Sequence, residues 1–274
     1  MAVSIAEITK LRKMTGAGMI DCKNALAEAN GDFDAAVELI RKRGQAIAAK
    51  REDRDASEGC VLAAAKDDYA AAVALKCETD FVATNQDFIS LTQMILDKAM
   101  ESRPADLEAL KAVNIDGRTI AELITDRSGI TGEKMELGDF MSLTAASTIS
   151  YIHPGNRLAT IVGFNKAGVE YQVARDVAMQ VAAMSPIAVS RDEFPAELVA
   201  KEFEIAKEKA REEGKPEAML EKIAEGRINK FYQENSLLEQ AFVKENKMSI
   251  KQYLGSKDKD LTVISFRRLT LNAE

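Results

Sequence analysis

Residues 60–77 read CVLAAAKDDYAAAVALKC, which is two apolar runs on either side of the polar turn Lys66-Asp67-Asp68. In the second run the apolar residues at 71, 73, 75 and 77 would share one side of the chain, and a period of two residues is typical of a β-strand. The stretch therefore predicts an antiparallel hairpin with strands over 60–65 and 70–77. From about Phe81 to Met100 the apolar spacing becomes helical, so we expect a helix after the hairpin.

A second stretch repeats this order of hairpin and helix. Runs over 147–153 and 157–165 flank the turn Pro154-Gly155-Asn156, and a helical pattern covers about 171–184. The two copies share little identity, so they form a weak internal repeat. Further strands, expected to complete the second sheet, are predicted over 237–243 and 263–271.

The N-terminal region, about 45 residues long, predicts three short helices. Ser4 and Glu7 have the spacing of a capping box at the start of the first helix. The glycines of Thr15-Gly16-Ala17-Gly18 favour a turn, and Asn30-Gly31 is typical of the end of a helix. The polar segment from Lys50 to Ser57 is expected to be the linker to the next domain.

The region after the second copy contains a charged pair of helices. Apolar residues recur at steps of four, three and four from Val199 to Ala210, as in a coiled-coil seam. The sequence Gly214-Lys215-Pro216 should end one helix and start the next. We predict an antiparallel helical hairpin over 195–232, which is either a solubilising protrusion or a contact arm.

The composition limits the classes of function. Hydrophobic residues make up 46% of the 274 residues, so the chain can bury a sizeable core. The net charge of −7 argues against direct binding of nucleic acid, because phosphate contacts need Lys and Arg. Six basic residues between Arg41 and Arg54 are a local exception. We interpret them as a solvated helix end and linker, with an acidic protein partner as the alternative.

The cysteines and the N-terminus indicate the compartment. Cys22, Cys60 and Cys77 are odd in number and form no C-x-x-C pair, which favours free, mostly buried thiols in a reducing environment. The N-terminus lacks the pattern of a signal peptide, and no apolar run approaches the ~20 residues that a membrane helix needs. We expect a cytoplasmic protein without membrane contact.

The sequence carries no recognisable pattern of catalytic residues. His153 is the single histidine, and no positioned nucleophile or acid accompanies it. The spacing of the cysteines and His153 matches no zinc motif, and Gly16-Ala17-Gly18 lacks the strand and third glycine of a dinucleotide site. We therefore expect no enzyme activity, no cofactor and no metal site.

The run Thr79-Asp80-Phe81-Val82-Ala83 directly follows the first hairpin. Asp80 could cap the helix that follows by accepting a backbone hydrogen bond. If Phe81 is buried, it is ordinary core, packed against Phe88. If Phe81 is exposed, the Asp and Phe form a charged wedge at the tip of a helix. The residues alone favour the first alternative, because most such patterns are structural.

At these residues the sequence resembles the elongation factor Ts family. The resemblance rests on three blocks in the expected order and covers residues 3 to about 271. They are Leu11 to Leu26 (LRKMTGAGMIDCKNAL, followed by Asn30-Gly31-Asp32), Cys77 to Ala83 (CETDFVA) and Tyr151 to Arg157 (YIHPGNR).

The resemblance implies an α+β architecture that agrees with the patterns above. The expected parts are a small three-helix, UBA-like module with its linker at 1–55, an N-terminal core half at 56–140 and a C-terminal core half at 141–274. Each half would hold an antiparallel sheet and helices, and the helical hairpin over 195–232 would belong to the second half.

The resemblance also implies a partner and a set of contact residues. The partner would be the GTPase elongation factor Tu, and Thr79, Asp80, Phe81 and Val82 would reach its magnesium site. Phe81 would be the wedge that displaces partner side chains, with Asp80 close to the ion. Contacts with the partner's nucleotide domain would come from Arg12, Met19 and Ile20, and the hairpin of His153 would lie against its β-domains.

The implied activity is exchange of GDP for GTP on the partner, driven by displacement of its magnesium ion. Some family members carry a helical extension after the last core strand, and because this chain ends at Asn272-Ala273-Glu274 we expect that contact to be missing. Ile20 stands where some members have Met, and both side chains are apolar. Two alternatives stay open: an adaptor that binds a protein without driving exchange, and a thiol enzyme using Cys77 or Cys22. Self-association also stays open.

Overall fold

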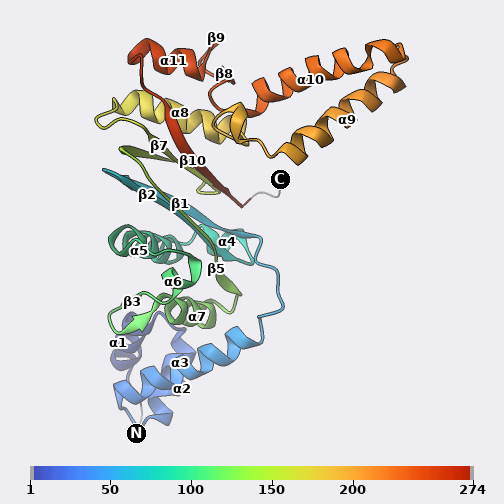
Figure 1. The fold of residues 1–274 in the computed structure, drawn as a ribbon. Coiled ribbons are helices and arrows are strands. Elements are labelled where there is room, and N and C mark those ends of the chain that lie inside the picture. Colours follow the sequence, from blue (N-terminus) through green and yellow to red (C-terminus); the bar gives the residue numbers. More distant parts are fainter. Residues whose placement is uncertain (1–2, 272–274) are drawn as a thin grey trace. The chain divides into compact units, whose positions relative to one another are not determined.

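The computed structural model describes residues 3–271 (Figure 1). The expectation about Asn272-Ala273-Glu274 lies outside the described residues. The chain folds into two compact units. Unit 1 comprises the chain up to Leu62, Val73–Met141 and the chain from Thr270, and unit 2 comprises Ala63–Ala72 and Ser142–Leu269. Helices and antiparallel strands are mixed in the chain, so the α+β prediction is confirmed.

The N-terminal helices of unit 1 are α1 (Ile5–Thr15), α2 (Met19–Glu28) and α3 (Phe33–Ala49). The predicted capping box is present, because the Ser4 side chain accepts from the Glu7 N–H and the Glu7 side chain accepts from the Ser4 N–H. Gly16 ends α1 with a φ of 74°, which is the left-handed conformation that favours glycine. The helices enclose a small apolar core of Ile8, Leu11, Ala17, Cys22, Ala25, Leu26 and Ala36.

Two glycines mark a close approach of α3 to α7 (Ile120–Thr131) within unit 1. A Cβ placed on Gly129 would lie 2.1 Å from the Cα of Gly44, whereas one on Gly44 would lie 3.4 Å from the Cα of Gly129. The two backbones therefore touch where the helices cross, and α3 is packed onto α7 through backbone contact.

The first sheet contains β1 (Glu58–Lys66), β2 (Tyr69–Cys77) and β5 (Met135–Thr144) in the order β1-β2-β5. The predicted hairpin is present, but β5 was not predicted. The tip of the hairpin, Ala63–Ala72, packs with unit 2: the N–H groups of Ala145 and Thr148 donate to the carbonyls of Asp68 and Asp67 at 2.9 and 3.1 Å.

The helices of the first core half are α4 (Asp80–Ala83), α5 (Gln86–Ser102), α6 (Leu107–Lys111) and α7. The short strands β3 (Asn114–Ile115) and β4 (Arg118–Thr119) pair between α6 and α7. In Figure 1 helices α5, α6 and α7 lie on one side of strands β1 and β2. The prediction of one continuous helix from Phe81 is wrong, because the Asn85 side chain accepts from the Asp87 N–H and starts α5 anew.

Unit 2 contains β6 (Ser147–Ile152), β7 (Leu158–Phe164), α8 (Tyr171–Met184) and β10 (Val263–Thr270). Strands β6 and β7 pair antiparallel from Ser147↔Phe164 to Ile152↔Ala159, and the strand order is β10-β7-β6. Helix α8 packs its buried face on β6 and β7. The second hairpin and its helix are thus present as predicted.

The strand predicted over 237–243 is largely absent. Only β8 (Ala241–Phe242) forms, and it pairs with β9 (Glu245–Ser249) ahead of α11 (Ile250–Lys257) instead of joining the second sheet. The reason is that the Gln240 amide donates to the carbonyls of Met184 and Glu234, which holds this segment in bends. Leu237 and Phe242 are buried in the core of unit 2 instead.

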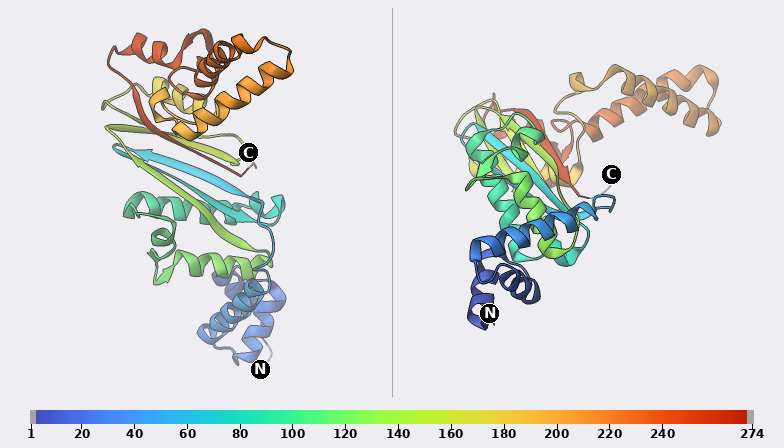
Figure 2. Two further views of the ribbon diagram at one scale, coloured as in Figure 1. Left: turned by 45° about the vertical axis from the view of Figure 1, so that its right-hand side comes forward. Right: turned by 90° about the horizontal axis from the view of Figure 1, so that it is seen from below.

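The helical hairpin consists of α9 (Ala196–Glu212) and α10 (Leu220–Asn235), joined through a short 3₁₀ turn at Glu217–Met219. The two helices run side by side in Figure 1 and in both views of Figure 2. Of the predicted seam, Ala206 and Ala210 are buried, whereas Val199 and Phe203 are only half-buried. Ala224 of the return helix is also buried. A second 3₁₀ turn at Arg191–Glu193 precedes the hairpin, and Phe194 then contacts the Phe231 ring at its base.

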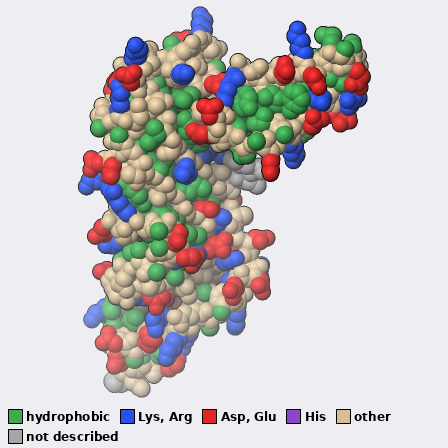
Figure 3. Space-filling model, in the orientation of Figure 1, with side chains coloured by type: hydrophobic (Ala, Val, Ile, Leu, Met, Phe, Trp, Pro, Cys, Tyr) green, Lys and Arg blue, Asp and Glu red, His purple; other side chains and the backbone are tan. Residues whose placement is uncertain are grey.

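Hydrophobic side chains gather along this hairpin on the face shown in Figure 3, where side chains of both charges are interspersed elsewhere. Phe194, Val199 and Phe203 line a shallow groove at the hairpin together with Tyr232. Within residues 3–271, no helix has the length and apolar character needed to span a bilayer.

Candidate functional site

Phe81 is the most exposed large hydrophobic side chain described in the chain, with 84% of its surface open to solvent. It lies in α4, a helix of four residues between the end of β2 and the start of α5. Phe88, in α5, is buried at 1% exposure. The interpretation of Phe81 as core is therefore wrong, and the alternative of an exposed aromatic at a helix tip holds.

Thr79 caps α4, so the expectation that Asp80 is the cap is wrong. The Thr79 Oγ1 accepts from the Val82 N–H at 3.4 Å, and the Asp80 carboxylate is exposed in the first turn. Thr84 closes the other end of the helix, because its hydroxyl donates to the carbonyl of Asp80 at 2.9 Å. Val82 is half-buried, so the turn presents Asp80 and Phe81 outward and turns Ala83 inward.

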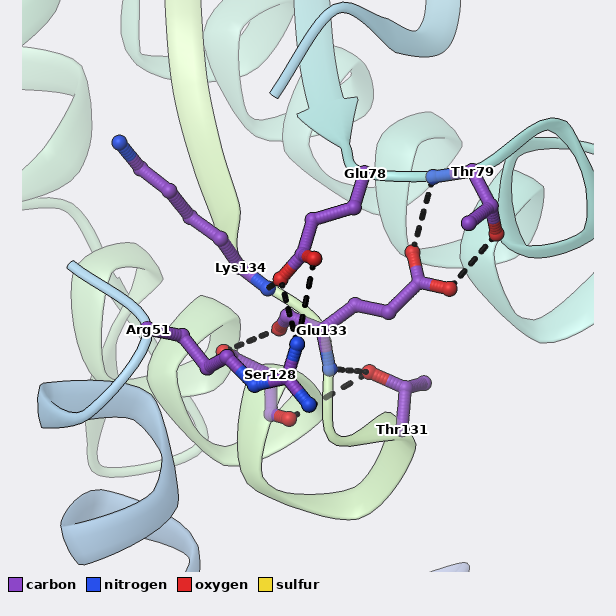
Figure 4. A network of polar contacts seen from close by, with 7 residues as sticks. All are labelled: Arg51, Glu78, Thr79, Ser128, Thr131, Glu133 and Lys134. Atoms are coloured by element: carbon purple, nitrogen blue, oxygen red, sulfur yellow. Dashed lines mark hydrogen bonds and ion pairs between the residues drawn. The ribbon is translucent and has the colours of Figure 1, made fainter. Parts of the chain in front are cut away.

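A network of charged and polar groups holds the base of this turn (Figure 4). The Glu133 carboxylate accepts from both the N–H of Thr79, at 3.1 Å, and the hydroxyl of Thr79, at 2.6 Å. In the opposite direction, the Glu78 carboxylate accepts from the N–H of Lys134 at 2.6 Å. The segments 78–79 and 133–134 thus exchange hydrogen bonds through their glutamates.

Further contacts fix the two glutamates. Arg51 donates to Glu78 at 3.2 Å, and the Glu78 side chain is only 16% exposed. Ser128 donates to the carbonyl of Glu133, and the N–H of Glu133 donates to the hydroxyl of Thr131 at 3.3 Å. Both hydroxyls come from the last turns of α7, so that helix sets the position of the Glu133 backbone. Sequence reasoning did not single out Glu133 or Glu78.

Cys77 lies directly before this network and is buried. Its thiol donates to the carbonyl of Thr79 at 3.2 Å. Burial, together with the nearby negative charge of Glu133, raises the pKa of the Cys77 thiol to about 12. The thiolate, which is the nucleophilic form, is therefore scarce at neutral pH, and Cys77 is a poor candidate for a thiol enzyme. Cys22, the other candidate, is buried in the core of the N-terminal helices.

Arg12, Met19 and Ile20 lie on the N-terminal helices, and all three side chains are exposed. Ile20 is 74% exposed, although its neighbours Cys22 and Leu26 on α2 are fully buried. Met19 and Ile20 are therefore apolar side chains that remain open to solvent at the start of α2.

His153 lies in unit 2, at the turn between β6 and β7. Its N–H donates to the carbonyl of Leu158 at 2.8 Å and closes the hairpin. Its Nδ1 is 3.2 Å from the hydroxyl of Tyr151, whose ring lies 5.7 Å from the Arg175 guanidinium. The imidazole itself is exposed, so His153 is a supported surface residue.

Among residues 3–271, no group of three or more His, Cys, Asp and Glu side chains is arranged to hold a metal ion. The chemistry of the turn is that of a contact surface: an aromatic ring and a carboxylate are presented outward, and the polar groups behind them are satisfied by one another.

Comparison with known proteins gives a consistent result. The family model described as "Elongation factor TS" matches residues 78–273. A protein of Porphyromonas gingivalis named elongation factor Ts is 60% identical over 275 residues, with both chains covered in full. Proteins of the same name from Azobacteroides pseudotrichonymphae and Bacteroides thetaiotaomicron are 56% and 44% identical, again over the whole of both chains.

Proposed function

The chain belongs to the elongation factor Ts family, and we propose that it binds the GDP form of elongation factor Tu in the cytoplasm and promotes release of GDP and its exchange for GTP. Membership of the family makes it an elongation factor of translation. The observation that carries the finer proposal is Phe81, an aromatic side chain held 84% exposed on a helical turn whose base is fully hydrogen-bonded.

The physical basis of exchange is linkage between two ligands of one partner. A magnesium ion that bridges GDP and its GTPase is the largest local charge in the nucleotide site. Insertion of the Phe81 ring beside that site would stabilise a shape of the partner that holds the ion poorly, so GDP would bind more weakly. By reciprocity, GDP weakens the binding of this chain by the same factor. The chain itself performs no bond-breaking step in this scheme.

The residues of the proposed contact have separate roles. Thr79 and Val82 shape the turn, Phe81 is the wedge, and Asp80 places a negative charge beside it, where it disfavours the arrangement of ligands around the ion. Arg12, Met19, Ile20 and His153 add contact surface elsewhere on the partner.

The direct test is release of a fluorescent GDP analogue from elongation factor Tu in the presence of excess unlabelled GDP. We expect the intact chain to accelerate release in a saturable manner and the acceleration to shrink when a chelator removes magnesium, because GDP then dissociates rapidly by itself. Formation of a stable complex on gel filtration without accelerated release would favour the adaptor and reject exchange.

A further inference from the structure

Glu133 lies 54 positions after Thr79 in the sequence, yet it accepts both hydrogen bonds that Thr79 donates. We propose that Glu133 is a positioning residue for exchange: its carboxylate fixes the turn that presents Phe81, and it acts on the partner only through that turn. This inference rests on the function proposed above, in which Phe81 is the contact that promotes GDP release.

The first step of the argument concerns the Thr79 hydroxyl. A hydroxyl has one proton and two lone pairs. Because the proton points to the Glu133 Oε1 at 2.6 Å, a lone pair is left to accept from the Val82 N–H and cap α4. Without Glu133 the hydroxyl is free to rotate, so the cap loses its preferred orientation as well as its anchor.

The second step concerns the length of α4. A helix of four residues has too few internal hydrogen bonds to hold its own shape, since nucleation is unfavourable and only longer helices become stable in isolation. Its geometry must come from its ends. The C-terminal end is held by Thr84 and the N-terminal end by Thr79, and the Thr79 N–H would be left without its charged acceptor if Glu133 were removed.

The third step concerns what holds Glu133. The Ser128 and Thr131 side chains fix its backbone, and the reciprocal bond from the Lys134 N–H to Glu78 fixes the neighbouring segment (Figure 4). Because the Glu133 backbone is fixed, its carboxylate restricts the position of Thr79. Phe81 lies two residues beyond Thr79, so its ring inherits the orientation that Glu133 imposes on the turn.

The experiment compares Glu133→Ala, Glu133→Gln and the control Glu122→Ala. Glu122 makes the same kind of contact on α7, because its carboxylate accepts from both the N–H and the hydroxyl of Thr119. That control therefore removes an equivalent pair of hydrogen bonds in the same unit, away from the turn. The amide of Glu133→Gln can still accept from the Thr79 N–H and can donate to the Thr79 hydroxyl, which keeps a lone pair for Val82.

The first measurement is amide hydrogen exchange on the isolated chain, which is independent of any partner. For Glu133→Ala we expect exchange at residues 79–84 to rise by roughly tenfold, because charge-assisted hydrogen bonds are lost there. Glu133→Gln should restore most of the protection, and Glu122→Ala should leave residues 79–84 unchanged. Unchanged exchange at 79–84 in Glu133→Ala would overturn the inference.

The second measurement is GDP release at saturating concentrations of each variant, at a temperature where all are folded. Glu133→Ala should slow release by roughly tenfold, because the Phe81 ring is no longer held where it contacts the partner, with Glu133→Gln and Glu122→Ala close to the unmodified chain. In the background of Phe81→Ala, Glu133→Ala should have no further effect. A further slowing in that background, or normal release from a chain whose turn is demonstrably loosened, would overturn the inference.

The two measurements separate the inference from the proposed function. If the unmodified chain fails to accelerate GDP release, exchange itself is rejected, and the amide measurement still decides whether Glu133 holds the turn. If the unmodified chain accelerates release and Phe81→Ala slows it, the function stands. If Glu133→Ala then neither raises amide exchange at residues 79–84 nor slows GDP release, the role of Glu133 is rejected.

Discussion

The two copies of the hairpin-and-helix plan each place an exposed aromatic residue after the second strand, but they support it differently. Phe81 follows β2 and is 84% exposed, and Tyr171 follows β7 at the first residue of α8 and is 67% exposed. Beneath Phe81, Thr79 caps the turn and Glu133 holds Thr79. Before Tyr171, the N-cap residue Glu170 makes no side-chain cap.

The segment between β7 and α8, residues 165–170, is held at its N-terminal end. The Asn165 amide group bonds with Asp260 and Thr262 at 2.8 Å, and Lys166 pairs with Asp258 at 2.7 Å. These bonds lie five or six residues before Tyr171 in the sequence. Both aromatic residues are exposed, and the copies differ in that the turn carrying Phe81 is held by hydrogen bonds of Glu133 to Thr79.

The largest expected effect comes from Phe81→Ala. Because the ring buries little surface within the chain, the thermal midpoint should move by no more than about 2 °C, as is usual for surface substitutions. GDP release should slow by roughly tenfold or more, which corresponds to about 1.4 kcal/mol of transition-state stabilisation. A large fall in the thermal midpoint together with an unchanged rate of GDP release would show that Phe81 supports the fold and does not promote exchange.

The next effect tests whether the contact of Glu133 with Thr79 depends on the position of α7. The Cβ of Gly129→Ala would meet the backbone of Gly44 at 2.1 Å, whereas the Cβ of Gly44→Ala would make an ordinary contact at 3.4 Å. We expect Gly129→Ala to destabilise unit 1 by about 1–3 kcal/mol, as overpacking does, and to slow GDP release because α7 carries Ser128 and Thr131. Gly44→Ala should change stability by less than about 1 kcal/mol.

Urea denaturation and GDP release of the two alanine variants measure this asymmetry. Equal effects of Gly129→Ala and Gly44→Ala would show that the helix crossing is looser than the structure has it. Loss of stability in Gly129→Ala with full exchange activity would show that the contact of Glu133 with Thr79 is independent of α7.

A smaller effect concerns unit 2, where the buried carboxylate of Asp176 lies in α8. It differs from Glu133, which holds the turn that precedes a helix. Burial opposes ionisation of Asp176, but hydrogen bonds from Lys244, Tyr253 and Gln172 outweigh it, so the pKa of Asp176 is lowered from 3.8. Because the folded-state pKa is depressed, its contribution to stability is present above the unfolded-state value and is lost as pH falls through the folded-state value.

Thermal melting of the unmodified chain and of Asp176→Asn measures this contribution. The midpoint of the unmodified chain should fall as the pH drops below the ordinary range of an aspartate, and the difference between the two chains should shrink in the same window. A constant difference between them across that window would show that Asp176 contributes through packing and not through its charge.

The smallest expected effect is that of Tyr171→Ala. The Tyr171 ring is exposed and is not part of the proposed contact, so GDP release should stay within about twofold of the unmodified chain and the thermal midpoint within about 2 °C. The same release assay that reports Phe81→Ala measures it. A loss of exchange comparable to that of Phe81→Ala would show that the contact of Glu133 with Thr79 does not distinguish the two aromatic residues.

The hairpins and most helices of this fold were predictable because their signals are local. Apolar runs on either side of polar turns identified β1 with β2 and β6 with β7, and the 3.6-residue period identified α8 from Tyr171 to Met184. Strand β5 was missed because its burial follows no simple alternation: only Met135, Leu137 and Leu143 of its ten residues are buried.

The candidate site shows why the rest was out of reach. Phe81 and Phe88 are seven residues apart, which in one continuous helix would place them on the same face and favour burial of both. The break at Thr84 and Asn85 starts a new helix and separates their directions. The Glu133 contact joins residues 54 positions apart, and no local pattern records a pairing at that distance.

The shared hairpin of the first sheet has a consequence for synthesis of the chain on the ribosome. Its tip, Ala63–Ala72, is synthesised early but packs with residues that begin at Ser142. Thr148 and Ala145, whose N–H groups donate to the carbonyls of Asp67 and Asp68, are synthesised only later. A nascent chain, or a fragment that stops inside β5, therefore carries a hairpin with a paired base and an unfinished, Ala-rich tip. In such a fragment the edge of β2 that β5 would cover is also unpaired, and unpaired strand edges are where incomplete chains associate, so we expect fragments that end before β5 to aggregate.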